Sequence, residues 1–195
     1  RLPGKVLRLV EGIPTIWRIV QRLSYSQRLS GIIVACSENP ADDRIAAYCS
    51  QNRIAYVRGS EAAVDQRLLL ALDKMGADAL VRVTADCPLV DPYLLDTLVN
   101  VWLADTSLDY VSNVWPNRTY PDGLDLEVIS RGGLEIIVNH EDQEGELWDH
   151  EALTTNVWKY AVMLFRIKSL DHTENLGELR WTVDRPDALY FVRWV

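Results

Sequence analysis

The stretch Leu80-Val81-Arg82-Val83-Thr84-Ala85-Asp86-Cys87-Pro88-Leu89-Val90-Asp91-Pro92 decides how the rest of the chain is interpreted. It begins inside an apolar run, residues 79–83, which is typical of a buried parallel strand. Asp91-Pro92 predicts the start of a helix, because Asp is favoured at the N-cap and Pro at the first helical position. Asp86 lies five residues earlier and therefore has no capping role in that helix.

Asp86 follows the predicted strand at the edge where open α/β sheets bind ligands. One hypothesis is that its carboxylate holds a divalent cation that carries phosphate groups. The alternative is a solvated loop aspartate in an Asx-turn. Asp184 repeats the arrangement, because it ends an apolar segment just before Arg185-Pro186, although helix capping alone would also explain it. The two carboxylates can share one cation if the two strand ends converge.

The composition excludes several classes of protein. The 195 residues fit one domain with a sizeable core, and 48% hydrophobic with 25% charged residues is ordinary for a globular chain. A net charge of -8 argues against a nucleic-acid partner, and no apolar run reaches membrane-spanning length. Cys36, Cys49 and Cys87 are odd in number and lack C-x-x-C spacing. They indicate free thiols in a reducing compartment, so we expect a cytoplasmic protein with no membrane partner.

Strands and helices alternate through the first part of the chain. We expect strands at 31–36, 54–57, 79–83 and 108–113, and helices that start near Pro14, Pro40, Ser60 and Pro92. Such alternation predicts an α/β fold with a mostly parallel sheet and right-handed crossovers. After residue 113 the alternation breaks into a small β excursion. There we expect a half-exposed strand at 124–129, strands at 161–167 and 179–184, and a last helix from Pro186.

Five motifs occur along the chain in a fixed order. They are Arg1-Leu2-Pro3-Gly4-Lys5, Arg58-Gly59-Ser60, Val81-Arg82-Val83-Thr84-Ala85-Asp86-Cys87-Pro88-Leu89, Tyr120-Pro121-Asp122-Gly123-Leu124-Asp125 and Arg180-Trp181-Thr182-Val183-Asp184-Arg185-Pro186. Together they resemble the cytidylyltransferases that activate acidic sugars. The branch with the greatest likeness is the spore-coat polysaccharide biosynthesis protein F type, and the CMP-sialate and CMP-Kdo synthetases are more distant.

The resemblance implies a fold and a reaction. Residues 1–195 would form a single nucleotidyltransferase domain, a three-layer, mostly parallel sheet of the nucleotide-diphospho-sugar transferase type. The chain begins at Arg1 without Met, and we expect the family's first strand and half of its phosphate loop to be missing. A sugar hydroxyl would attack the α-phosphate of CTP with Mg²⁺ as cofactor, giving a CMP-sugar for surface polysaccharide. The family also implies a homodimer.

The resemblance also implies roles for individual residues, carried over by position. Arg1, Lys5 and Asp86 would be catalytic, Arg1 and Lys5 would hold the triphosphate, and Asp86 with Asp184 would bind Mg²⁺. Nucleotide contacts would include Arg58, Ser60 and Arg67. Tyr120, Asp122 and Asp125 lie where the family binds the acceptor sugar or forms its dimer contact, and His150 would also meet the sugar. The chain departs from the family at Gln66, where the related branch usually has Asp, and in the segment 148–154 around His150.

Two alternatives stay open. A glycosyltransferase on the same fold would need a D-x-D-like metal motif, for which Asp125-Leu126-Glu127 is the near match. A degenerate, non-catalytic member is favoured by Gln66 and opposed by the retained Lys5, Asp86 and Asp184. For the homodimer we expect a contact near residues 115–129, because this stretch holds aromatic residues and a strand with a free edge.

Overall fold

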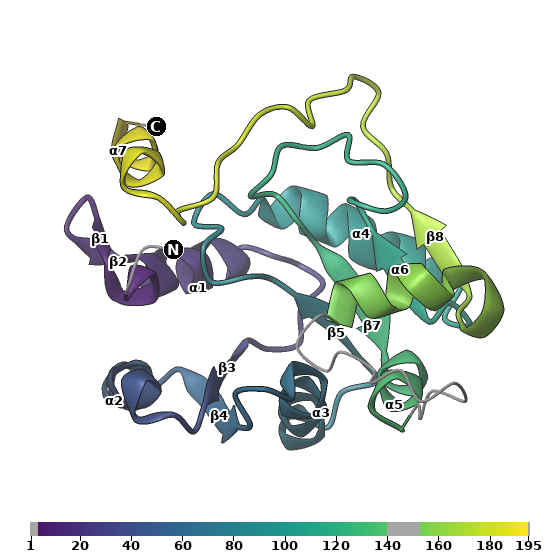
Figure 1. Ribbon diagram of the computed structural model, residues 1–195, viewed down its shortest axis with the longest axis horizontal. Coiled ribbons are helices and arrows are strands. Elements are labelled where there is room, and N and C mark those ends of the chain that lie inside the picture. Colours follow the sequence, from purple (N-terminus) through teal and green to yellow (C-terminus); the bar gives the residue numbers. More distant parts are fainter. Residues whose placement is uncertain (1–3, 140–152, 195) are drawn as a thin grey trace.

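The computed structural model describes residues 4–139 and 153–194 (Figure 1). Its strands are β1 (Leu9–Val10), β2 (Ile13–Pro14), β3 (Ile33–Ser37), β4 (Ala55–Gly59), β5 (Ala79–Arg82), β6 (Tyr110–Ser112), β7 (Glu127–Ser130) and β8 (Ile167–Ser169). Its α-helices are α1 (Thr15–Leu23), α2 (Asp43–Gln51), α3 (Val64–Met75), α4 (Pro92–Ala104), α5 (Arg131–Asn139), α6 (Leu153–Leu164) and α7 (Pro186–Trp194). Short 3-10 helices cover Lys5–Leu7 and Pro40–Asp42.

The strands β3 and β4 pair in parallel, and a larger sheet has the strand order β5-β7-β6-β8. β7 is antiparallel to both β5 and β6, whereas β6 and β8 are parallel. Within this sheet β5, β6 and β8 therefore share one direction, and β7 alone opposes them. The predicted α/β fold with a mostly parallel sheet is confirmed.

Most of the predicted helices begin at their predicted caps. Asp91 Oδ1 accepts from the Tyr93 and Leu94 N–H groups at 2.8 and 3.3 Å at the start of α4. Asn39 caps the short 3-10 helix Pro40–Asp42 through the Ala41 N–H, and α2 follows from Asp43 without a side-chain cap. Helix α3 is an exception, because it begins at Val64 rather than after Ser60. Ser60 Oγ accepts from the Ala63 N–H instead, so this serine stabilises the turn before the helix.

The strand predicted to be half-exposed at 124–129 is β7, and the prediction of exposure is wrong. All four residues of β7 are buried, and β5 and β6 pair with its two edges. Val128 packs with residues of α1 and α4, whereas Ile129 packs with residues of α3, α5 and α6. The period-two alternation instead reflects Glu127, a buried carboxylate that pairs with Arg82 of β5. The free strand edge on which we based the dimer contact is therefore absent from β7.

The predictions of strands at residues 161–167 and 179–184 are also wrong. Residues 161–164 belong to helix α6, and β8 begins only at Ile167. A short apolar run fits a buried helix as well as a strand, which explains the error. Residues 179–184 form no regular strand, although Arg180 makes one parallel bridge with Asp122.

The core lies on both faces of the larger sheet. One cluster joins α1 and α4 through Ile19, Leu95 and Leu98, and the other joins α3, α5 and α6 through Leu72, Leu134 and Val157. This gives helix, sheet and helix layers, as the predicted three-layer architecture requires. Among residues 4–139 and 153–194, the helices lack the length and apolar character needed to span a membrane.

Two long connections lie side by side above the sheet (Figure 1). Residues 113–126 and 170–185 exchange backbone hydrogen bonds, among them Leu176 N to Thr119 O at 2.9 Å and Trp181 N to Asp122 O at 2.6 Å. Gly123 permits this approach, since its φ is +115° and a Cβ there would lie 2.8 Å from the carbonyl carbon of Trp181. The connections are thus locked together at the residues that carry several predicted site carboxylates.

Candidate active site

A cavity of about 510 Å³ opens where β5 ends. It is lined by four cations, Lys5, Arg67, Arg82 and Arg180, and by three carboxylates, Asp86, Asp122 and Asp125. Val64, Thr84, Ala85 and Thr182 complete the lining. The cations come from four separate segments of the chain, so the fold has gathered them.

Lys5 and Asp86 form an ion pair in this cavity. Lys5 Nζ lies 2.5 Å from Asp86 Oδ2, and both side chains are only partly exposed. Burial raises the pKa of Asp86, but hydrogen bonds from Lys5 and Thr84 lower it by more, so the pKa lies below its ordinary value. Asp86 is therefore an ionised carboxylate in the segment that follows β5, and its role as a ligand of a divalent cation stays a prediction.

The side chain of Arg82 is held by a buried network of polar side chains. Its guanidinium donates to Glu127 and, at 2.8 Å, to Thr154 Oγ1. Glu127 also accepts from the Tyr110 hydroxyl and from Thr154 Oγ1. Burial opposes the charge of Arg82, but the Glu127 carboxylate outweighs it and the pKa of Arg82 is raised. Arg82 thus presents a permanent positive charge to the cavity.

Arg180 ties the two long connections to each other. It donates to Asp122 Oδ2 and, at 2.5 Å, to Asp184 Oδ2. Next to it, Arg118 makes a two-pronged contact with Asp125, at 2.5 and 2.8 Å. Each of the carboxylates Asp122, Asp125 and Asp184 is therefore held in place by an arginine beside it.

Arg67 of α3 has an unused donor. Its Nη1 donates to the Ser60 carbonyl at 2.8 Å, which fixes the side chain against the turn before α3. Its Nε is buried and has no hydrogen-bond partner within the described parts of the chain. A buried donor without a partner costs free energy, so an acceptor supplied by a ligand would be stabilising here.

The structure brings together several of the predicted site residues and leaves out others. Lys5, Arg67, Asp86, Asp122 and Asp125 line the cavity. The predicted residues outside its lining are Arg58, which pairs with Asp43 at 2.8 Å, Ser60, Asp184, and Tyr120, whose ring meets His172 edge-on at 5.1 Å. Arg1 and His150 lie outside the described residues.

Sequence reasoning missed Arg82 and Arg180 as site residues. Both stand inside motifs that were recognised, one at the end of the predicted strand 79–83 and the other two residues before Thr182. A charged residue inside an otherwise apolar strand was a signal for Arg82, because such a side chain needs a buried partner or a ligand. Arg180 has a local partner in Asp184, four residues on, but its second partner Asp122 lies 58 positions away, so the sequence does not show that Arg180 lines the cavity.

The residues present fit a divalent cation bound together with phosphate. The Val183 N–H donates to the Asp86 carbonyl at 2.7 Å, which brings the segment of Asp184 against that of Asp86. Within the described segments there is no group of three or more His, Cys, Asp or Glu side chains that could hold a metal. Mg²⁺ needs no such cage, because it commonly takes one or two carboxylates and completes its shell with water and substrate phosphate.

Comparison with known sequences identifies relatives that are named for spore-coat polysaccharide biosynthesis and for cytidylyl transfer. The spore coat polysaccharide biosynthesis protein SpsF of Bacillus subtilis (strain 168) is 28% identical, over 94% of this chain and 76% of that protein. The 3-deoxy-manno-octulosonate cytidylyltransferase of Pelobacter propionicus is 26% identical, over 55% of this chain and 42% of that enzyme.

Solved structures support the same fold. A cytidylyltransferase from Leptospira borgpetersenii superposes with a TM-score of 0.86 at 24% identity, covering 99% of this chain and 79% of the other. CMP:2-keto-3-deoxy-manno-octonic acid synthetase, solved in complex with CTP, superposes with a TM-score of 0.70 at 18% identity, covering 100% of this chain and 92% of the other.

The cytidylyltransferase family model matches residues 1–180, which confirms the family that the five motifs resemble. The chain therefore belongs to the cytidylyltransferase family of enzymes.

Proposed function

We propose that the protein transfers CMP from CTP to the hydroxyl group of an acidic sugar. The oxygen of the sugar hydroxyl attacks the α-phosphorus and its proton is lost to solvent, while the bond from that phosphorus to the bridging oxygen breaks and pyrophosphate leaves. The observation that carries this proposal is the pair of Lys5 with Asp86, set at the end of β5 in one cavity with three arginines. Such a site suits a polyanion whose reaction depends on positioning and charge neutralisation.

The cations are assigned to the phosphates of the nucleotide. Lys5, and Arg1 by family resemblance, would bind the triphosphate and offset the charge of the departing pyrophosphate. Arg67 offers its unpartnered Nε, and Arg82 is fixed by Glu127 so that no reorganisation is needed when a phosphate arrives. Preorganised donors of this kind stabilise developing charge more than mobile ones do.

The carboxylates Asp86 and Asp184 are assigned to Mg²⁺. When bound, the ion would neutralise phosphate oxygens and stabilise the charge that develops on them. Both carboxylates are already ordered, Asp86 by Lys5 and Asp184 by Arg180. This arrangement supports a cation that arrives with the nucleotide and whose remaining ligands are phosphate oxygens and water.

The acceptor is assigned to the side of the cavity near Asp122 and Asp125. Carboxylates accept hydrogen bonds from sugar hydroxyls, and Arg118 and Arg180 stand beside them as partners for a sugar carboxylate. Tyr120 and His150 are further candidates from the family resemblance. The names of the relatives favour an acidic or nonulosonic sugar, used for a surface polysaccharide such as a spore coat.

The test is pyrophosphate release by the purified full-length protein from α-labelled CTP and Mg²⁺, with a panel of nonulosonic and other acidic sugars. We expect a labelled CMP-sugar together with pyrophosphate. Asp86→Asn should lower turnover by about 100-fold or more, since several kcal/mol of charge stabilisation are lost. Asp105→Asn, at an exposed carboxylate beyond the end of α4, is the matched control and should keep full activity.

Other outcomes would point to the alternatives. Sugar transfer from a nucleotide-sugar donor, without consumption of CTP, would favour a glycosyltransferase. Absence of both activities would favour a non-catalytic member, and near-normal turnover of Asp86→Asn at saturating Mg²⁺ would contradict the role of Asp86.

We also propose that the enzyme acts in the cytoplasm, where CTP is available, and that it is a homodimer.

A further inference from the structure

Arg180 lies between two carboxylates that belong to different connections of the chain. Its Nη1 donates to Asp122 Oδ2, and its Nη2 donates to Asp184 Oδ2 at 2.5 Å. One guanidinium group with a single positive charge is therefore shared by two negative charges. The nearby Arg118 contributes less to this pair, because its Nη1 lies 3.8 Å from Asp122 Oδ1 but 2.5 Å from Asp125 Oδ1. Arg180 is thus the main neutralising charge for Asp122 and Asp184.

A third carboxylate also acts on Arg180. Burial lowers the pKa of Arg180, but Asp122, Asp184 and Asp86 raise it by more. A divalent cation competes well with an arginine in such a setting, because it brings two positive charges to the same oxygen ligands. Asp184 is one of the two carboxylates assigned to Mg²⁺ above, so Arg180 and the metal compete for one carboxylate.

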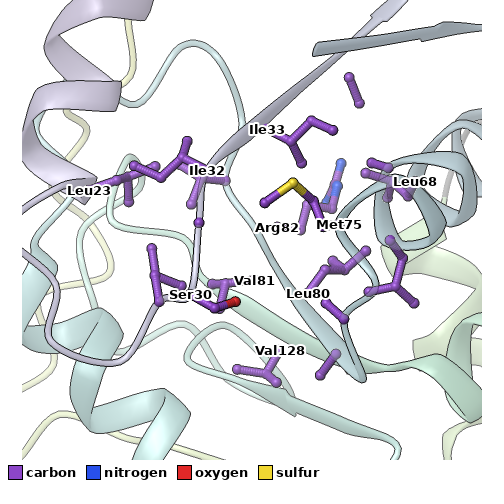
Figure 2. A pocket seen from close by; sticks show the side chains of 18 of the residues that line it. Leu23, Ser30, Ile32, Ile33, Leu68, Met75, Leu80, Val81, Arg82 and Val128 are labelled. Atoms are coloured by element: carbon purple, nitrogen blue, oxygen red, sulfur yellow. The ribbon is translucent and has the colours of Figure 1, made fainter. Parts of the chain in front are cut away.

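The larger cavity beside the candidate active site is a poor alternative for a metal. It has a volume of about 630 Å³, lies between β3 and β5, and shares Arg67 and Arg82 with the site (Figure 2). The side chains labelled in Figure 2 are apolar except those of Ser30 and Arg82. Among the described residues that line this cavity, Asp78 is the single carboxylate. A change in metal binding after substitution of Arg180 can therefore be attributed to the smaller cavity.

We propose that Arg180 is the built-in counterion of Asp122 and Asp184, and that it keeps the affinity of the site for a free divalent cation low until nucleotide is present. The part of Asp184 as a metal ligand rests on the proposed function. A free cation must break the contact between Arg180 and Asp184, which leaves Nη2 without that acceptor. A cation that arrives with a nucleotide brings phosphate oxygens, and these offer Nη2 a new acceptor. Arg180 is thus a positioning residue through which binding of metal and binding of nucleotide depend on each other.

The test measures Mn²⁺ binding to the purified full-length protein without nucleotide, from the electron paramagnetic resonance signal of free Mn²⁺. Arg180→Gln should raise the affinity for Mn²⁺ about fivefold or more, the gain expected when a unit charge about 4 Å away is removed in water. Arg185→Gln is the matched control, because it removes the same charge from an exposed residue next to Asp184. It should change the affinity by less than about twofold, since solvent and salt screen an exposed charge. Arg180→Lys keeps a charge near Asp184 and should also stay within about twofold.

A second measurement separates this proposal from the proposed function. Binding of labelled CTP is measured by equilibrium dialysis with and without Mn²⁺. The factor by which Mn²⁺ strengthens CTP binding should be smaller for Arg180→Gln than for the unmodified protein, because the coupling of two ligands is reciprocal. Complex formation between Mn²⁺ and CTP in solution is the same for both proteins and cancels in the comparison. Absence of CTP binding would contradict the proposed function, whereas Mn²⁺ binding without nucleotide would still decide the role of Arg180.

Two results would overturn the proposal, namely an unchanged Mn²⁺ affinity of Arg180→Gln and an equal gain in Arg185→Gln. If Arg180→Gln fails to fold, NMR of the arginine side chains in the unmodified protein decides instead. Saturating Mg²⁺ without nucleotide should shift the guanidinium signal of Arg180, assigned through Arg180→Lys, and should leave that of Arg185 in place. A signal of Arg180 that does not move would then overturn the proposal.

Discussion

Replacing Glu127 with Gln tests whether the buried network behind the site fixes Arg82. Glu127 is 4% exposed and accepts hydrogen bonds from Arg82, Tyr110 and Thr154. An amide keeps the shape of the carboxylate but removes its charge and turns one acceptor into a donor. At least one of the three donors then loses its partner in a buried position.

The structure sets the expected magnitude. Breaking a buried ion pair by removing one partner costs about 3–5 kcal/mol. The Arg82 side chain retains 24% exposure toward the cavity, so water screens part of the charge that is left behind. We therefore expect the lower end, about 3 kcal/mol, for Glu127→Gln. Tyr110→Phe removes a single hydrogen bond to the same carboxylate and should cost about 1.5–3 kcal/mol.

Urea unfolding measures both variants. With a slope of about 2–3 kcal/mol per molar urea, Glu127→Gln should lower the midpoint by about 1 M or more. The double variant should cost less than the sum of the two single variants, because both changes act on one network. A loss below about 1 kcal/mol, smaller than that of a typical buried hydrogen bond, would refute the idea that Glu127 neutralises Arg82.

Three further predictions concern charge, thiols and assembly. Lys5→Met should destabilise the protein at pH values above the ordinary carboxyl pKa, because the lowered folded-state pKa of Asp86 contributes stability there that is lost as the pH falls through it. The difference in stability between the variant and the unmodified protein should therefore vanish as acid protonates Asp86. Urea midpoints at several pH values measure this difference, and a difference that does not change with pH would contradict the prediction. Burial raises the pKa of Cys87 to about 12 and that of Cys49 to about 11, so both thiols should resist iodoacetamide at pH 8 until the protein unfolds, as mass spectrometry can check. We expect a homodimer in sedimentation equilibrium, and a single monomer at micromolar concentration would refute it.

The part of the fold that sequence could predict is the part that local signals encode. Asp91 caps α4 as its position before Pro92 indicates, and the helices and strands up to residue 113 occur near their predicted positions. The insertion of β7 between β5 and β6 has no local signal, since it is decided by which strand edges meet. The same alternation of apolar and polar residues fits both an exposed strand and a buried strand that carries one paired carboxylate. β7 is a buried strand of this type, and Glu127 is its paired carboxylate.

The site shows the same division between local and long-range information. Asp86 was identifiable because a carboxylate at a strand end without a capping role needs another explanation. The partners that give it a chemical setting come from far along the chain, Lys5 from 81 positions earlier and the Val183 N–H from near the C-terminus. Motif order could place these residues in one family, but only the folded chain shows Arg82 and Arg180 as two further cations in that cavity.

The positions of Asp122 and Asp125 depend on backbone contacts rather than on a regular strand. Asp122 and Asp125 flank Gly123, whose positive φ and lack of a side chain let the two long connections pair at Trp181. Arg180 then bridges Asp122 and Asp184 across the same junction. Because the Val183 N–H of this junction also donates to the backbone carbonyl of Asp86, the Asp122 side and the Asp86 side of the cavity are held in one hydrogen-bonded unit. A shift in either connection must therefore move both sides of the site together.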